Sequence, residues 1–515
     1  MNLLDLSELD LSGVAISAAI DADGALTCVD EEGMRDKVAA IRDSRLVRIH
    51  TLVVAADQQG LEGVGDNEHD GIHVVYAETL CQALDHLQAD AQTRWRYLLD
   101  QSAEFQRHPP LVGREWLLDQ MDAAIAKAAS GNGPAYVLLT AAAGMGKSAI
   151  VAQAVRQRQD AVYHFIRRDM PGWDDPNRIF QSLCAQVCRL RALPLSQDKE
   201  SQPSKQPAEA LLDALQRAAP HLDDAHPLVL WLDGLDEAFG RLGRHQREAL
   251  PGLLPRMLPP HVVVVLTSRP GEHLDWLGDH SLCHALTLEA GASDNQADIR
   301  KYLEEENLRR ALDLPAEFVS KLVEASEGCF AAATRYLEDP LRLKAWQADP
   351  DSIPRGLDGW LADQWRWMMV QAAKQFHSSF EDLLRLTLGL LATAREPVSW
   401  NQLDALLRLE AKMPVGAYSS VDLHRHLRPA LRLAEGLFEP RSGVDESAPW
   451  RFFHTRFQEY VLERLSTNER QDLDRVLAMG CGNWANLPED EARRYALAHR
   501  LQHLAETQDR KAWRE

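Results

Sequence analysis

Apolar residues in the middle of the chain come in short unbroken runs, separated by stretches with the spacing of amphipathic helices. The runs lie at 136–140, 161–166, 228–232 and 262–266. Because they show no polar alternation, they indicate strands that are buried on both faces. Buried strands that alternate with helices are typical of a parallel sheet covered by helices on both sides. We therefore predict an α/β core over residues 109–275.

The chain before this core has a weaker pattern. Residues 1–90 mix short strand-like and helical runs and predict a small α/β domain. Its strand candidates lie at 14–16, 46–55 and 72–76. A helical stretch at 91–108 is expected to link this domain to the core, because Pro109 and Pro110 end it.

The chain after the core is predicted to be mainly helical. Beyond residue 290, Leu, Ala and Trp recur at helical spacing. Short strand candidates interrupt this spacing near Leu437 and Trp450.

The charge balance limits the class of partner. With 56 Lys and Arg against 77 Asp and Glu, the formal net charge is −21. Nonspecific nucleic-acid binders and proteins docked on anionic membranes need a basic surface, so neither partner is expected. No apolar run reaches the roughly 18 residues of a membrane span, and residues 1–6 lack the basic segment of a signal peptide. The seven scattered cysteines predict neither a zinc cage nor a disulfide framework. We expect a cytoplasmic protein.

The segment AAAGMGKS at 141–148 joins the apolar run 136–140 to a helical stretch, which is the context of a phosphate-binding loop. Glycines let successive N–H groups point at phosphates, a lysine reaches the β- and γ-phosphates, and a serine hydroxyl binds Mg²⁺. Ala141 stands where the motif GxxxxGKS has its first glycine, which is tolerable if its φ is negative. We predict a site for ATP or ADP with Mg²⁺. Its loop residues are Gly144, Met145, Gly146, Lys147, Ser148 and Ala149.

Acidic residues follow the apolar run 228–232. Asp233 would stand at the carboxyl end of a strand, where doubly wound sheets bind ligands, and is predicted to hold Mg²⁺ directly or through water. Asp236 or Glu237 could polarise the attacking water. A solvated acidic loop would explain the acids alone, but not their place beside a phosphate loop.

The apolar run 262–266 continues into Thr267, Ser268 and Arg269. Arg269 would therefore leave a central strand at the same edge of the sheet, where it could contact the γ-phosphate. The alternative is a surface arginine that caps a strand end.

Taken together, these residues resemble the STAND class of signalling ATPases, P-loop NTPases related to the AAA+ proteins, and within it the NACHT-like bacterial members. The motifs that carry the resemblance are the phosphate loop, LVGRE at 111–115, DGLDE at 233–237, TSRP at 267–270, EGCF at 327–330, REPV at 395–398 and FFHTRFQEY at 452–460.

The resemblance implies a domain order and further site residues. It implies a helical domain at 276–345, a winged-helix region at 346–470 and a C-terminal helical segment at 471–515. It also implies adenine contacts from Val112, Gly113 and Arg114, and it adds Pro397 and His454 to the nucleotide site. His454 would contact the β-phosphate of ADP and lock an inactive state. A histidine between aromatic residues is otherwise a core residue.

The first 90 residues resemble, more weakly, the C-terminal half of a Lon-type protease domain. The segments that match lie at 14–20, 33–41, 49–55 and 72–84. Arg35 occupies the motif position of the lysine base, and an arginine cannot deprotonate; Lys37 matches a different lysine. We expect a truncated, proteolytically inactive Lon-like domain, with a generic small α/β domain as the alternative.

These expectations favour a nucleotide-dependent conformational and oligomerisation switch with slow hydrolysis. The resemblance to STAND proteins alone implies a role in bacterial stress or antiphage defence. Self-association with ATP and a separate sensor or effector protein are expected. The segment 495–501 resembles the start of sensor repeats, but the given sequence ends at Glu515. Three alternatives stay open: the sensor is a separate partner, the chain is truncated, or its helical end senses the trigger. Two alternatives remain: a turnover AAA+ remodelling ATPase, and a transcription regulator that reads DNA through 400–407 and 423–433. The basic residues of the second candidate are Arg425, Arg428 and Arg432.

Overall fold

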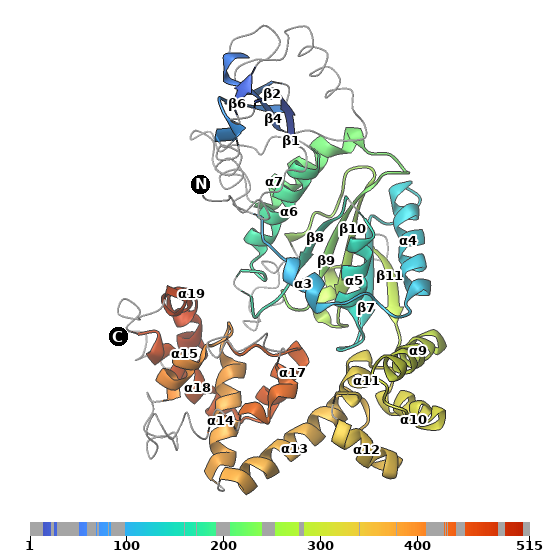
Figure 1. Ribbon diagram of the computed structural model, residues 1–515, viewed down its shortest axis with the longest axis vertical. Helices are drawn as coiled ribbons and strands as arrows, with labels where there is room; N and C mark the ends of the chain where they lie inside the picture. Colours follow the sequence, from blue (N-terminus) through green and yellow to red (C-terminus); the bar gives the residue numbers. More distant parts are fainter. Residues whose placement is uncertain are drawn as a thin grey trace.

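A computed structural model describes the chain in several ranges (Figure 1). They are residues 14–21, 25–27, 51–58, 68–69, 72–80, 82–83, 98–158, 160–170, 172–191, 207–238, 253–277, 283–338, 340–376, 379–407, 427, 429, 431–438, 449–482 and 490–507. A small sheet near the N-terminus lies at one end of a central α/β core, and the helices of the second half lie at the other end.

The N-terminal sheet has the strand order β1-β4-β6-β5. Its strands are β1 (Val14–Ser17), β4 (Thr51–Ala55), β6 (Ile72–Ala77) and β5 (Glu68–His69), with β2 (Ala19–Ile20), β3 (Leu26–Thr27) and the 3-10 helix η2 (Ala56–Gln58) beside it. The first three strands are parallel, and β5 pairs antiparallel to β6. The predicted helix that carries Arg35 and Lys37 lies outside the described residues.

The core sheet is parallel throughout, in the order β11-β7-β10-β9-β8. Its strands are β7 (Tyr136–Ala141), β8 (Val162–Phe165), β9 (Leu228–Asp233), β10 (Val262–Ser268) and β11 (Cys283–Leu288). Four of them match the apolar runs of the sequence.

Helices cover both faces of this sheet. They are α4 (Glu115–Ala129) and α5 (Lys147–Arg156) on one side, and α6 (Pro176–Leu190) and α7 (Pro207–Ala218) on the other, with the 3-10 helices η3 (Ala219–His221) and η4 (Glu272–Leu277). Leu138 and Leu230 pack toward α6 and α7, whereas Val137 and Trp231 pack toward α4 and α5. Burial on both faces explains why the strands read as unbroken apolar runs. The predicted fold class is confirmed.

The strand β11 is absent from the sequence prediction. It pairs with β7 at the edge of the sheet, and its exposed positions alternate with covered ones. An edge strand is solvated on one side, so Cys283–Leu288 lacks the unbroken apolar run of the central strands. The sheet thus extends to residue 288, past residue 276, where we expected the helical domain to begin.

Helices make up most of the second half. The helical lid, as we call α9–α12, consists of α9 (Ser293–Arg309), α10 (Ala316–Ser326), α11 (Phe330–Tyr336) and α12 (Pro340–Ala348). The C-terminal helical region, as we call α13–α19, consists of α13 (Gly356–Phe376), α14 (Ser379–Thr393), α15 (Trp400–Leu407), α17 (Thr455–Glu463), α18 (Thr467–Gly480) and α19 (Asp490–Glu506), with the 3-10 helices η5 (Pro350–Ser352), before α13, and η7 (Glu435–Leu437). One apolar core extends through both parts.

Two isolated β-bridges interrupt the C-terminal helical region, Val398 with Trp450 and Phe438 with Phe452. They fall at the strand candidates of the sequence. Among the described residues, no helix is both long and apolar enough to cross a membrane.

The linker before the core is only partly helical where the structure describes it. The helix α3 (Ser102–Arg107) forms, but residues 98–101 are not helical. The Gln101 side chain bonds both backbone groups of Phe165 at 2.9 Å and so fixes the linker to the edge strand β8. Arg107 donates to the Phe453 carbonyl at 3.1 Å, so α3 also contacts the C-terminal helical region.

Candidate nucleotide site

The phosphate loop connects β7 to α5. Gly144 and Gly146 have φ values of 75° and 94°, which side chains other than glycine rarely adopt. Gly146 caps α5, so the N-terminus of this helix faces the loop. Ala141 is the last residue of β7 and has extended backbone, which explains why no glycine is needed there. The loop has the form that cradles phosphates.

Lys147 folds back over this loop. Its Nζ donates to the carbonyls of Ala141 at 2.8 Å and Ala142 at 3.0 Å. Burial lowers its pKa, whereas the charges of Asp236 and Asp233 raise it. The ammonium group therefore lies close to the acidic residues that follow β9.

Asp233 and Ser148, the predicted Mg²⁺ ligands, are brought together. Burial raises the pKa of Asp233, and hydrogen bonds from Ser148 and Thr267 lower it. The Thr267 hydroxyl donates to the Asp233 carboxylate and accepts from the Gly234 N–H at 3.0 Å. A hydroxyl and a carboxylate oxygen beside a phosphate loop are the ligands that Mg²⁺ prefers, so these residues fit the ion.

Asp236 and Glu237 lie in the turn after β9 but have different partners. The Asp236 carboxylate accepts the Arg269 N–H at 3.0 Å and pairs with its Nε at 3.0 Å. Glu237 accepts from the Thr455 hydroxyl at 2.9 Å and from the Arg168 N–H at 3.3 Å. Burial raises the pKa of Glu237 to about 7. Asp236 therefore holds Arg269 at the end of β10, whereas Glu237 contacts Thr455 at the start of α17.

Arg269 leaves the end of β10, as expected, but its guanidinium is engaged by protein carboxylates. Besides Asp236, it contacts Glu459 on α17, with Nη1 at 3.0 and 2.8 Å from the two carboxylate oxygens. The predicted contact of Arg269 with a γ-phosphate stays a prediction.

His454 stands at the N-cap of α17. Its Nδ1 accepts from the Arg456 N–H at 3.0 Å, which leaves Nε2 as the ring position that carries hydrogen in the neutral form. Burial, together with the nearby charges of Arg269 and Lys147, lowers its pKa to about 3. The ring is therefore neutral near pH 7 and lies close to both cations. The predicted phosphate contact of His454 stays a prediction.

The predicted adenine segment lies at the start of α4. Val112 is half-buried, and Gly113 has a φ of 78° and no room for a side chain, because a Cβ would lie 2.3 Å from Asp298 Oδ1. Arg114 is 1 % exposed; its backbone N–H and its Nη1 donate to Asp298 Oδ2, and its Nη2 donates to the Met145 carbonyl at 3.2 Å. Arg114 thus connects the phosphate loop to the helical lid.

Sequence reasoning missed the residues of the lid that touch the loop. The Ala331 N–H donates to the Gly144 carbonyl at 2.9 Å. A side chain on Gly144 would lie 2.7 Å from Cys329 Sγ. Small residues at the start of α11 let the lid approach the loop. In the sequence, the run AAA at 331–333 indicates such a close approach.

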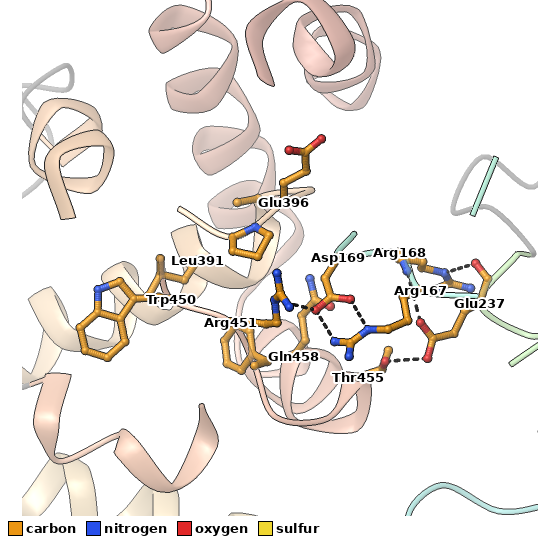
Figure 2. Close-up of a pocket in the computed structure, with 13 residues that line it drawn as sticks. Arg167, Arg168, Asp169, Glu237, Leu391, Glu396, Trp450, Arg451, Thr455 and Gln458 are labelled. Atoms are coloured by element: carbon orange, nitrogen blue, oxygen red, sulfur yellow. Dashed lines mark hydrogen bonds and ion pairs between the residues drawn. The ribbon is translucent and has the colours of Figure 1, made fainter. Parts of the chain in front are cut away.

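Pro397 lies between the core and the C-terminal helical region, away from the contact of the lid with the phosphate loop. It lines a small pocket between the core and the C-terminal helical region together with Glu237 and Arg451 (Figure 2). Figure 2 shows Asp169 between Arg167 and Arg451 and the Thr455 hydroxyl directed at Glu237. No motif indicated Arg167 or Asp169. Ala149 lies in the first turn of α5, close to the loop.

The parallel sheet, the phosphate loop and the acidic strand end define a P-loop NTPase core. In agreement, residues 110–265 match the family model described as AAA ATPase domain. The chain therefore contains an ATPase domain of the AAA type. A search of curated proteins gave no match.

Solved structures with a similar fold share little sequence. A STAND protein with a tetratricopeptide-repeat sensor from Pyrococcus horikoshii has 11% identity and a TM-score of 0.42; the match covers 79% of this chain and 50% of that one. A Walker-type ATPase of Pyrococcus abyssi has 12% identity and a TM-score of 0.31, with 68% and 98% covered. The Orc1 protein of Aeropyrum pernix, in complex with DNA, has 16% identity and a TM-score of 0.32, with 72% and 96% covered. This chain spans half the length of the STAND protein.

Proposed function

We propose that this protein is an ATP- and ADP-binding signalling NTPase that acts as a nucleotide-dependent conformational switch. The observation that carries the proposal is the position of α17. Two of its residues hold the groups that would read the γ-phosphate: Thr455 bonds Glu237, and Glu459 bonds Arg269. A helix of the C-terminal region that grips these groups couples the nucleotide to the arrangement of the chain.

In this proposal the phosphates bind the loop residues Gly144–Ala149, with Lys147 as the charged ligand. Ser148 and Asp233 would hold Mg²⁺, which neutralises charge on the phosphate oxygens. Val112, Gly113 and Arg114 would contact the base, and the bond from Arg114 to the Met145 carbonyl ties them to the phosphate loop. The neutral His454 ring would donate its Nε2 hydrogen to the β-phosphate and stabilise the closed form.

Exchange of ADP for ATP adds a group that only an open form can bind fully. The γ-phosphate competes with Glu459 for Arg269, and a nucleotide shifts a conformational equilibrium only through its different affinity for the two states. Glu237 or Asp236 would polarise water for hydrolysis. While Thr455 holds Glu237, hydrolysis is expected to be slow. In the ATP-bound open form, the C-terminal helical region is released from the core and offers a surface for self-association.

Size-exclusion chromatography with light scattering tests the switch. We expect a monomer with ADP and a larger assembly with ATP or a nonhydrolysable analogue. His454→Ala should assemble without a trigger, and Lys147→Ala should bind neither nucleotide and stay unassembled. A parent protein that elutes identically with all three nucleotides would overturn the proposal.

A turnover AAA+ remodelling ATPase is the second candidate, favoured by the match of residues 110–265 to an AAA ATPase domain. It predicts fast, steady phosphate release and a ring of subunits rather than slow hydrolysis. The switch proposal includes three further parts, which rest on the resemblance to NACHT-like STAND proteins. They are an output in bacterial stress or antiphage defence, a separate sensor or effector, and an inactive Lon-like N-terminal domain.

A further inference from the structure

The pair of Arg269 and Glu459 joins two distant parts of the chain. The residues lie 190 positions apart, and the Nη1 of Arg269 donates to both carboxylate oxygens of Glu459. The Nε of the same guanidinium pairs with Asp236 at 3.0 Å. One cation is therefore shared by a carboxylate of the core and a carboxylate of α17. Charge-assisted bonds of this kind are stronger than bonds between neutral groups.

From this arrangement we infer that Glu459 determines the nucleotide preference of the closed form, because it occupies the arginine that a γ-phosphate needs. The inference rests on the proposed function, in which Arg269 contacts the γ-phosphate. A diphosphate leaves the pair of Arg269 and Glu459 intact. A triphosphate must displace the carboxylate first, so the closed form binds ADP in preference to ATP.

The local charges support this assignment. Arg269 carries one positive charge and pairs with the carboxylates of Asp236 and Glu459, so these three side chains together are negative overall. Both partners are partly covered, with exposed side-chain fractions of 23% for Arg269 and 34% for Glu459. Solvent screening at this exposure is incomplete. The repulsion therefore acts on the γ-phosphate and leaves a diphosphate in the loop largely unaffected.

Glu459 also has a second partner when Arg269 leaves. Arg456, one turn earlier on α17, has its Nη1 4.0 Å from Glu459 Oε2 and is held by Asp358 and Glu463. The displaced carboxylate can pair with Arg456 and does not become a buried unpaired charge.

The test uses the full chain with Glu459→Gln, which keeps the shape of the side chain and removes its charge. Calorimetric titration with ADP and with ATP should show ATP binding about tenfold tighter than in the parent, the change expected when one charge-assisted bond no longer competes. ADP binding should change by less than about twofold. The matched control is Asp472→Asn on α18, whose carboxylate pairs with Arg475 of the same helix and with neither Arg269 nor Arg456. It should leave both affinities unchanged.

A double-mutant cycle identifies the route of the effect. In an Arg269→Ala background, Glu459→Gln should no longer alter the preference between ATP and ADP. If Glu459→Gln strengthens both nucleotides equally, or acts without Arg269, the inference is wrong. Should Glu459→Gln melt far below the parent, Glu459→Asp, which withdraws the carboxylate by one methylene, serves with the same expected direction. If the parent binds neither nucleotide, the proposed function fails as well; if it binds and switches but its preference is unmoved, only the inference fails.

Discussion

The hydroxyl of Thr455 donates a hydrogen bond to the carboxylate of Glu237 across 2.9 Å and joins the first turn of α17 to the turn after β9. The two residues lie 218 positions apart. Glu237 also accepts from the backbone of Arg168, so it is held from two sides. A carboxylate fixed in this way is not free to orient a water molecule beside a nucleotide.

Removal of the Thr455 hydroxyl should therefore accelerate hydrolysis. Thr455→Val keeps the volume and removes the donor, and we expect basal phosphate release to rise about two- to tenfold, the range for one lost hydrogen bond. Thr455→Ser retains the hydroxyl and should keep the parent rate. A rate that is unchanged or lower in Thr455→Val, with normal ATP binding, would contradict the restraint.

Hydrolysis should depend on pH through Glu237. Burial raises the pKa of this carboxyl to about 7, so the ionised form that polarises water is lost as the pH falls through 7. We expect the phosphate release rate to fall several-fold, up to about tenfold, from pH 7 to pH 6. His454 stays neutral over this range, because its pKa lies at about 3. Glu237→Gln should lower the rate and remove the acid limb, whereas Glu463→Gln should retain it. If Glu237→Gln keeps the fall in rate between pH 7 and pH 6, that fall belongs to the titration of another group.

The parts of the site that could be predicted are those set by local sequence. Asp233 ends one buried strand, Arg269 follows another, and Lys147 follows the glycine loop after a third. Parallel strands place their carboxyl ends at one edge of the sheet. Thr455, Glu459 and Asp298 could not be predicted as partners. Each lies on an amphipathic helix, where a polar residue that meets a distant arginine or carboxylate has the same spacing as one that meets water.

The conformation of the phosphate loop gives a prediction about Gly144. An added side chain would be strained by the φ of 75° and would lie 2.7 Å from Cys329 Sγ and 2.9 Å from Ala331 Cβ. Gly144→Ala should lose about 2–4 kcal/mol of unfolding free energy and weaken nucleotide binding, because the lid must move off the loop. Thermal unfolding and nucleotide titration measure both effects.

Gly131 provides the matched control. Its φ is 71°, but nothing lies within 4 Å of an added Cβ. Gly131→Ala should therefore cost only the backbone strain, about 1 kcal/mol, and leave nucleotide affinity unchanged. Equal losses in the two variants would mean that the contact of the loop with α11 contributes nothing.

The last prediction concerns Arg114, which is buried between the phosphate loop and the helical lid. Burial lowers its pKa to about 10, and the charge of Asp298 offsets only part of this effect. The Asp298 carboxylate also accepts from the Trp116 indole at 2.9 Å. Asp298→Asn leaves the guanidinium buried without a counter-charge, so we expect a loss of about 3 kcal/mol in unfolding free energy and weaker ATP and ADP binding. Lys301 and Glu115 form a second ion pair between α9 and α4, at 3.5 Å, but their side chains are 50% and 70% exposed. Lys301→Met should change stability by less than about 0.5 kcal/mol. If the two variants melt alike, the buried pair does not hold the lid on the core.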